Sequence, residues 1–509
     1  MKLIIRFILT LFVASPLYAQ TAIKNPDPFV MVWRITEAPD TITILSADFG
    51  YDFDINWGDG TTETINGNNP VIKHAYADTG SYTVEIDGMF PHMSIDEDDA
   101  EKLMEVSSWG DIRWYDMTGM FENAVYVQIT ATDAPDLSQA TSMSRMFKRA
   151  FYMGGDISHW DVSTITDMSN LFESAVTFDQ DISSWDVSSV TNFSMTFYNA
   201  RNFNQNLNTW DVSAAENMQL MFQNAIKFNS DISDWDVSSV TNFQLMFAEA
   251  PAFNQDIGDW DVSSGTRFTK MFSRAVAFNQ DIGNWDVSSG TIFQGMFNGA
   301  SSFNQDISEW DVSNAYNIAN IFRSAESFDQ NIGKWDVSGV SSIFDVLTNA
   351  ELSTENYDSL LVGWSKLPEL FNNVNFNGGR STYSSVGAVA RQKIIDDFGW
   401  TFTDGGLADS TSVSSEVDKS LPAGFSLEQN YPNPFNPSTN IEYSIPVASK
   451  VAIDVYNLTG QKVASLVNGT RAAGKHSVRF DASGLSSGIY IYRIQAGEFN
   501  LTKRMTLIK

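Results

Sequence analysis

Aspartates recur at fixed intervals through the middle of this 509-residue chain, and their type and spacing could do chemistry. One series holds equivalent positions 25 residues, or a multiple of 25, apart: Asp156, Asp181, Asp231, Asp256, Asp281 and Asp306. A second series begins at Asp161 and follows a tryptophan in every unit. Carboxylates ~5 Å apart repel one another and attract Ca²⁺ or a basic partner. The spacing therefore suggests an acidic contact strip.

Two interpretations of these aspartates stay open. In the first, Asp161 and its equivalents accept hydrogen bonds from backbone amides in a turn that precedes a helix. In the second, Asp181 and its equivalents form an exposed strip that binds a protein, a glycan or a cation. If Ile182 points inward, strand alternation turns Asp181 outward. The predicted interaction face is Asp156, Asp181, Gln205, Asp231, Gln255, Asp256, Asp281 and Asp306, and a calcium strip would use Asp181, Asp231, Asp256, Asp281 and Asp306.

The sequence does not favour an enzyme. Its four histidines, His74, His92, His159 and His476, fall in separate segments. No His-rich metal motif, phosphate loop, dinucleotide fingerprint or serine nucleophile elbow is present. A glycosidase needs one asymmetric carboxylate pair with separated pKa values, which a ladder of equivalent aspartates does not supply. We therefore predict no catalytic residues and no cofactor, with Ca²⁺ as the one cation to consider, and interpret His74 with Asp59 as part of a turn.

Charge and cysteine content exclude further classes of function. The chain has 31 basic and 62 acidic side chains, a net charge of −31. Nucleic-acid binding depends on Lys and Arg neutralising phosphates, so no nucleic-acid partner is expected. An anionic membrane surface is disfavoured for the same reason. With no cysteine, the chain has no disulfide, thiolate metal site or Cys nucleophile.

The elements that must position the aspartates are short repeats. The tetrad Trp-Asp-Val-Ser returns every 25 residues from Trp160 to Trp335. Phe193, Phe197 and Ala200 stand at i, i+4 and i+7, which predicts a short helix, and the segment from Phe203 to Leu207 is long enough for a strand. The Trp and Phe columns are expected in the core. One unit buries too little to fold alone, so the units must stack.

The string from Met296 to Ser313 resembles the short repeat of BspA-like bacterial surface proteins. That resemblance covers roughly Met117 to Ala350. It implies a variant leucine-rich-repeat solenoid displayed outside the cell and used in adhesion. Specificity would then lie in the outward Asp181 column or in the units that break it, at Asn206 and Asn331.

The segments before the repeats have their own signatures. Lys2, Arg6 and an apolar run predict a signal peptide at residues 1–19. Residues 25–95 alternate as β-strands, notably Val30 to Ile35, Ile42 to Leu45 and Tyr82 to Ile86. Its Trp-Gly-Asp-Gly-Thr run at 57–61 and its His-Ala-Tyr at 74–76 resemble PKD-like sandwich domains. Residues 96–142 are predicted to be an N-terminal cap with a degenerate repeat, ahead of the regular repeats at 143–350.

The segments after the repeats change texture twice. Residues 351–404 predict a C-terminal cap with a helix from Ser385 to about Phe398 that stops at Gly399, and residues 405–420 predict a linker. Residues 421–509 open on Tyr-Pro-Asn-Pro-Phe-Asn-Pro and continue as alternating strands. They resemble the C-terminal sorting domain of the type IX secretion system of Bacteroidetes, which implies that secretion machinery as a partner. No segment is apolar enough to span a membrane.

The predicted fold class is multidomain: a PKD-like β-sandwich, an α/β leucine-rich-repeat-like solenoid and a small C-terminal all-β sandwich. The predicted function is an exported, cell-surface or secreted, non-enzymatic adhesin-like protein that contacts an extracellular protein or glycan. The alternative is a carbohydrate-binding accessory protein that holds a polymer at the cell surface. Glycan binding that depends on exposed aromatics, and not on Asp181 and Asp256, would favour the alternative.

Overall fold

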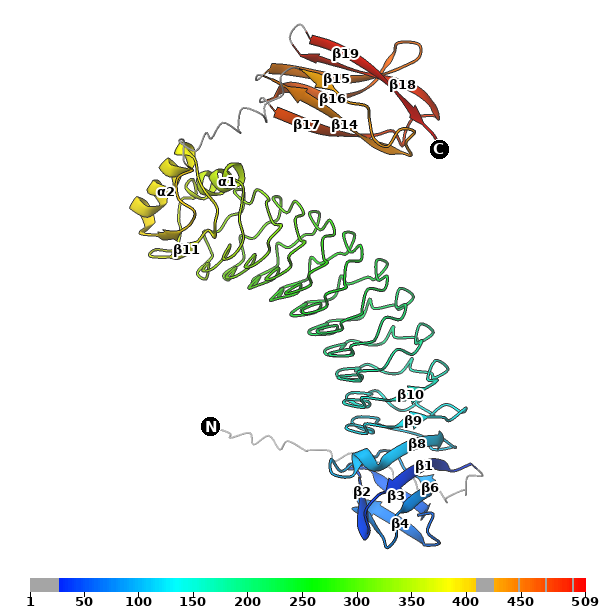
Figure 1. The fold of residues 1–509 in the computed structure, drawn as a ribbon. Helices are drawn as coiled ribbons and strands as arrows, with labels where there is room; N and C mark the ends of the chain where they lie inside the picture. Colours follow the sequence, from blue (N-terminus) through cyan, green and yellow to red (C-terminus); the bar gives the residue numbers. More distant parts are fainter. Residues whose placement is uncertain (1–26, 409–424, 447–448, 472–473, 497–498) are drawn as a thin grey trace, which may run out of the picture. The chain divides into compact units, whose positions relative to one another are not determined.

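The computed structural model describes residues 27–408, 425–446, 449–471, 474–496 and 499–509 (Figure 1). The chain divides into two compact units, residues 1–408 and 409–509. The predicted signal peptide and most of the predicted linker lie outside the described residues. No helix in the described ranges has the length and apolarity to cross a bilayer.

The first unit begins with a β-domain of two sheets. A seven-stranded sheet has the order β10-β9-β8-β1-β6-β3-β4, and a three-stranded sheet has the order β5-β2-β7. A 3-10 helix, η1 (Ala100–Lys102), lies between β7 and β8 in the chain. The strands of the two sheets are β1 (Phe29–Ile35), β2 (Asp40–Leu45), β3 (Gly50–Asn56), β4 (Thr62–Asn68), β5 (Ile72–Tyr76), β6 (Gly80–Met89), β7 (Ser94–Ile95), β8 (Leu103–Ser108), β9 (Gln128–Ile129) and β10 (Gly154–Gly155). The three predicted strands are confirmed as β1, β2 and β6.

The large sheet continues directly into the first repeats. Strand β8 pairs in parallel with β9, and β9 pairs in parallel with β10. Strands β9 and β10 belong to successive repeats, 26 residues apart between Gln128 and Gly154. The β-domain and the repeats therefore share one backbone ladder, and their buried side chains form one hydrophobic core.

The predicted fold class is wrong, because the repeats are not an α/β leucine-rich-repeat solenoid. Each regular unit consists of turns. Its β-type pairing with the neighbouring units is limited to isolated parallel bridges such as Asn192↔Asn217. In the described residues, α-helix occurs only at α1 (Thr354–Trp364) and α2 (Ser385–Phe398), both beyond the units. The predicted strand from Phe203 to Leu207 is also wrong, since this segment has no regular backbone pairing.

The helix prediction failed because tandem turns share the period of a helix. Met195 and Asn199 have φ angles of 58° and 57°. Residues with such positive φ cannot continue a right-handed helix. Two successive turns of four residues nevertheless bury Phe193, Phe197 and Ala200, which is the same i, i+4, i+7 stripe. Burial alone does not separate the two structures.

Backbone amides of these turns join each unit to the next. The amide nitrogens of Phe193 and Met195 donate to the carbonyl oxygens of Asn217 and Gln219, both at 2.9 Å. The Thr191 amide donates in the opposite direction, to Thr166 O at 2.9 Å. Interior phenylalanines of successive units stack with ring centroids 5.4–5.8 Å apart. The units therefore depend on one another, as expected for repeats too small to fold alone.

A small helical region follows the last repeat. Ser353 and Ser384 accept amide hydrogen bonds at the N-termini of α1 and α2, and Gly399 ends α2 with φ 69°. The predicted helix from Ser385 and its stop at Gly399 are therefore confirmed. Strands β11 (Asn375–Asn377) and β12 (Thr401–Thr403) pair in parallel beside the helices.

The second unit is all-β in its described residues. One sheet has the order β13-β14-β17 and the other β16-β15-β18-β19, and a single hydrophobic core includes side chains from both. The strands are β13 (Ser426–Leu427), β14 (Ser438–Ile445), β15 (Ser449–Asn457), β16 (Lys462–Arg471), β17 (Gly474–Asp481), β18 (Gly488–Ala496) and β19 (Phe499–Leu507).

Candidate functional site

The two aspartate series occupy one kind of turn, and we call them together the acidic edge. In the first series, Oδ1 of Asp181 accepts the Ser183 amide at 3.0 Å. In the second, Oδ1 of Asp161 accepts the Ser163 amide at 3.1 Å. All six aspartates of the first series make this bond to the residue two positions later: Asp156, Asp181, Asp231, Asp256, Asp281 and Asp306. The Asp161 series therefore accepts backbone amides as predicted, although no helix follows its turn, and the exposed Asp181 series makes the same bond.

A serine two positions after the aspartate adds a hydroxyl hydrogen bond to the amide hydrogen bond of the turn. Hydrogen bonds from the Ser183 hydroxyl and amide hold the pKa of Asp181 below its ordinary value. Bonds from Ser163 lower the pKa of Asp161 in the same way. The residue two positions after Asp256 is Gly258, and the residue two positions after Asp281 is Gly283. Each glycine donates only its backbone amide to the aspartate. The serine bonds favour the charged form of Asp161 and Asp181, because a carboxylate accepts them and a protonated carboxyl does so less well.

The first-series aspartates are exposed, while Ile182 between them and the core is fully buried. Their described hydrogen bonds stay within their own turn through Oδ1. The described residues contain no group of three or more His, Cys, Asp or Glu side chains able to hold a metal ion. The structure therefore presents the series as a row of separate charges on one edge.

Two units interrupt the row without changing its backbone. Asn206 Oδ1 accepts the Asn208 amide at 2.9 Å, and Asn331 Oδ1 accepts the Gly333 amide at 2.9 Å. Asparagine thus forms the same turn without the charge. Near Asn331 in the chain, Lys334 forms an ion pair with Glu309 of the preceding unit.

The predicted face residues Gln205 and Gln255 couple neighbouring units. Gln205 Nε2 donates to Asp179 O at 3.0 Å, and Gln255 Nε2 donates to Asn229 O at 2.6 Å. Beside them, Asn254 Oδ1 accepts the Asn279 amide at 2.9 Å. This amide ladder replaces backbone pairing along the segment predicted as a strand, so these glutamines are already engaged within the chain.

The tryptophan column is buried, as predicted. Trp235 is 3% exposed, and its Nε1 donates to Leu207 O of the preceding unit at 2.8 Å. The same bond recurs from Trp185 to Trp335. Trp160, the first of the column, is buried without such a partner in the described residues. The column holds units together and is not a sugar platform.

His74 and Asp59 stabilise a turn in the β-domain. His74 Nε2 lies 2.8 Å from Asp59 Oδ2, and the ring stacks on Trp57 with centroids 4.6 Å apart. Burial acts to raise the pKa of Asp59, but hydrogen bonds from Thr61 and His74 lower it to about 2. Tyr76 Oη donates to Trp57 O at 2.9 Å and ties the turn to the core.

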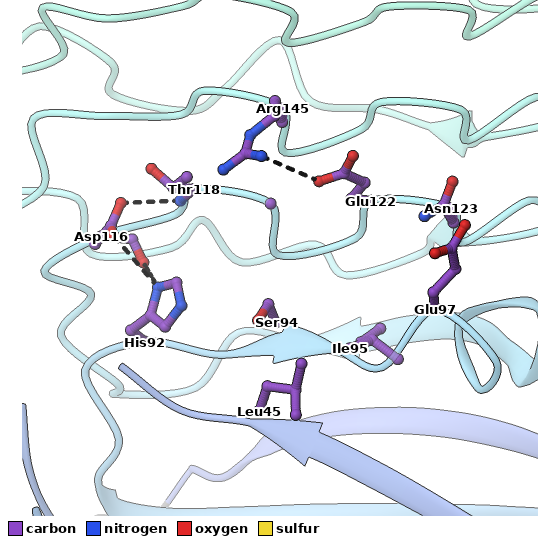
Figure 2. A pocket seen from close by; sticks show the side chains of 11 residues that line it. Leu45, His92, Ser94, Ile95, Glu97, Asp116, Thr118, Glu122, Asn123 and Arg145 are labelled. Atoms are coloured by element: carbon purple, nitrogen blue, oxygen red, sulfur yellow. Dashed lines mark hydrogen bonds and ion pairs between the residues drawn. The ribbon is translucent and has the colours of Figure 1, made fainter. Parts of the chain in front are cut away.

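Sequence reasoning missed a groove between the β-domain and the first repeats, which we call the junction groove, and Figure 2 shows the part of it around His92. It consists of two neighbouring hollows of about 460 and 410 Å³ that share Glu97 and Asn123. Their linings come from β2, from the segment His92 to Glu101, and from turns of the first two repeats. The lining residues are scattered along the chain between Leu45 and Phe151, and no local pattern in the sequence indicates that they lie close together.

One side chain of the junction groove is both buried and polar. His92 is 6% exposed, and its Nδ1 lies 2.9 Å from Asp116 O and 3.5 Å from Asp116 Oδ2. Asp116 Oδ1 accepts the Thr118 amide at 2.9 Å. In Figure 2, Arg145 and Glu122 lie on the repeat side of the hollow, opposite Leu45 and Ser94. Arg145 Nη1 lies 3.9 Å from Glu122 Oε2.

Comparison with known proteins identifies two parts of the chain. The repeats match the family described as "Mycoplasma protein of unknown function, DUF285" at residues 115–230, 207–293 and 266–360. Residues 429–509 match the family described as "Secretion system C-terminal sorting domain". No curated protein matches the chain.

These matches establish the setting in which the protein acts. The middle of the chain consists of repeats of the DUF285 kind, a match that is consistent with the predicted resemblance to BspA-like surface repeats. The sorting domain involves the type IX secretion machinery and shows that the protein is exported, then secreted or attached at the cell surface. Residues 25–95 lie outside both matches, so their resemblance to PKD-like domains stays a prediction.

Proposed function

We propose that the protein is a non-enzymatic, adhesin-like binding protein that contacts a basic region of an extracellular protein through its acidic edge. The observation that carries this proposal is the row of exposed aspartates, each fixed in a turn by Oδ1. Fixed charges of one sign attract an oppositely charged surface and speed its encounter. Because the aspartates are equivalent, they lack the asymmetry that acid–base catalysis requires.

Asparagine substitution provides a clean test, since Asn206 and Asn331 already form the same turn. The triple variant Asp231→Asn, Asp256→Asn, Asp281→Asn should keep the fold and lose most capture of partners from host or community surface extracts. Its control, Glu355→Gln, Glu369→Gln, Asp396→Asn, changes the net charge equally at positions after the repeats. Equal capture by both variants, or hydrolytic turnover of surface polymers by the purified protein, would contradict the proposal.

A second candidate is a carbohydrate-binding accessory protein, and one observation favours it. Tyr126 and Tyr152 are 41% and 55% exposed and stack with ring centroids 5.7 Å apart. Exposed aromatic rings are common sites of ligand contact. Residues 25–95 would serve as the accompanying PKD-like module. Glycan-array binding lost in Tyr126→Ala and Tyr152→Ala, but kept in Asp181→Asn and Asp256→Asn, would favour this function over the first.

A further inference from the structure

The junction groove carries opposite charges on its two walls. Glu97, Asp98 and Glu101 lie on the β-domain side, whereas Arg145 and Arg149 lie on the repeat side. Asp116 and Glu122 also line the repeat side, but Glu122 is paired with Arg145 and Lys148, and Asp116 accepts the Thr118 amide. Among the described residues, Arg149 and the three carboxylates have no ion-pair partner, and Arg145 reaches only Glu122, at 3.9 Å. The walls therefore present charges that do not neutralise each other across the gap.

The acidic wall is held in place from behind. Strand β7 pairs with β2 through Ile44↔Ile95. The Thr43 amide donates to Oδ2 of buried Asp99 at 2.7 Å, and Lys102 Nζ lies 2.7 Å from Asp99 Oδ1. These bonds fix the segment that carries Glu97, Asp98 and Glu101, so the wall is preorganised for a ligand.

The basic wall is fixed by the repeat backbone. Arg145 and Arg149 both have φ 58° and sit at equivalent left-handed positions of two successive turns. Their amides donate to Ser169 O at 2.9 Å and to Glu173 O at 2.7 Å in the next unit. Because both backbones are tied to independent partners, the two walls cannot close on each other without breaking hydrogen bonds.

Apolar side chains complete the lining. Leu45 and Ile95 line one hollow, and Val125 and Phe151 line the other. Such surfaces accept the methylene stems of long charged side chains whose ends reach polar groups. Each hollow has a volume within the range of ligand sites, ~300–1,000 Å³.

We propose that the junction groove binds an extended peptide segment whose side chains alternate between basic and acidic. In an extended chain, successive side chains point to opposite sides. Alternation therefore brings every basic group to Glu97, Asp98 and Glu101 and every acidic group to Arg145 and Arg149. The lining of this site shares no residue with the acidic edge, and the site adds a second partner chemistry to the proposed function.

The probe is an eight-residue peptide of alternating lysine and glutamate, capped at both ends and dye-labelled, titrated with the full-length protein by fluorescence anisotropy. A peptide of the same composition with lysines and glutamates in adjacent pairs is the matched control, since its two faces carry mixed charges. We expect the alternating peptide to bind at least about tenfold more tightly, a difference of ~1.4 kcal/mol.

Variants of the basic wall have a matched control in the chain. Arg274 occupies the position equivalent to Arg149 five units later, with φ 60°. Asn199 and Asn224 show that asparagine fits this position. Arg149→Asn should weaken binding of the alternating peptide about tenfold, whereas Arg274→Asn should leave it unchanged. Glu97→Gln combined with Glu101→Gln should weaken it to a similar extent.

Several results would overturn the proposal: no binding, equal affinity for both peptides, or equal loss in Arg149→Asn and Arg274→Asn. Unchanged thermal unfolding of Arg149→Asn shows that its loss of binding is local, and Arg149→Gln replaces it if that variant fails to fold. The triple asparagine variant of the acidic edge should bind the alternating peptide normally. Failure of this site and failure of the proposed function are thereby distinguishable.

Discussion

The tryptophan column and the acidic edge recur with equal regularity but have different structural roles. The Trp235 indole reaches back to Leu207 O of the preceding unit. Asp261 Oδ1 accepts the Ser263 amide of its own turn, and its carboxylate also bonds the Ser263 side chain. One column therefore joins units, whereas the other shapes a single turn and leaves its charge at the surface. The sequence period shows which positions are equivalent. Whether the side chain's hydrogen bond reaches a neighbouring unit or stays within its own turn shows the structural role of each position.

Removing a joining side chain should have the largest effect. Trp235→Ala should lower the free energy of unfolding by about 3–5 kcal/mol, because it leaves a cavity and removes the indole hydrogen bond to Leu207 O. Trp235→Phe, which loses the indole bond but keeps an aromatic ring, should cost less. Urea unfolding followed by circular dichroism measures both. Equal stability of Trp235→Ala and the wild type would remove the distinction between the columns.

The amide ladder should show the next largest effect. Asn254→Ala leaves the Asn279 amide without its acceptor, at a cost of about 1–3 kcal/mol. Asn254→Asp should cost less, since Asp179 and Asp329 already serve as acceptors at this position, for the amides of Asn204 and Ser353. The same urea titration compares them, and a larger loss in Asn254→Asp would show that charge, not hydrogen bonding, governs the ladder.

Changes in the acidic edge should cost less still. Asp261→Ala removes the acceptor of the Ser263 amide and should destabilise the protein by about 0.5–1.5 kcal/mol. Asp261→Asn keeps the acceptor and should be close to neutral. The thermal midpoints of the two variants measure the difference. If both variants lose the same stability, the charge of Asp261 contributes to folding beyond its turn.

Acidification should produce the smallest effect per residue. Hydrogen bonds from serine lower the folded-state pKa of Asp161, Asp211, Asp261 and Asp286. In the unfolded chain these groups titrate near about 3.9. Their contribution is therefore present above that pH and is lost as the pH falls through the lower folded values. Urea midpoints between pH 7 and about 2.5 should fall, and Asp261→Asn with Asp286→Asn should reduce the slope.

Sequence periodicity was sufficient to predict the core columns and the helix from Ser385, but not the path of the repeats. The buried stripe of Phe193, Phe197 and Ala200 fits a helix and a pair of turns equally well. What separates them is positive φ at Met195 and Asn199, and neither residue type demands that conformation. The inter-unit hydrogen bonds impose it.

The sequence by itself determined the register of the repeats, the buried columns, the excess of negative charge and the export signal at the C-terminus, because each depends on residue type and spacing along the chain. Only the tertiary structure decided that Gln205 and Gln255 are engaged within the chain and that Glu97 and Arg149 line one groove. The physical reason is that these features depend on hydrogen bonds and packing between segments 26 or more residues apart, whose direction a linear pattern does not specify.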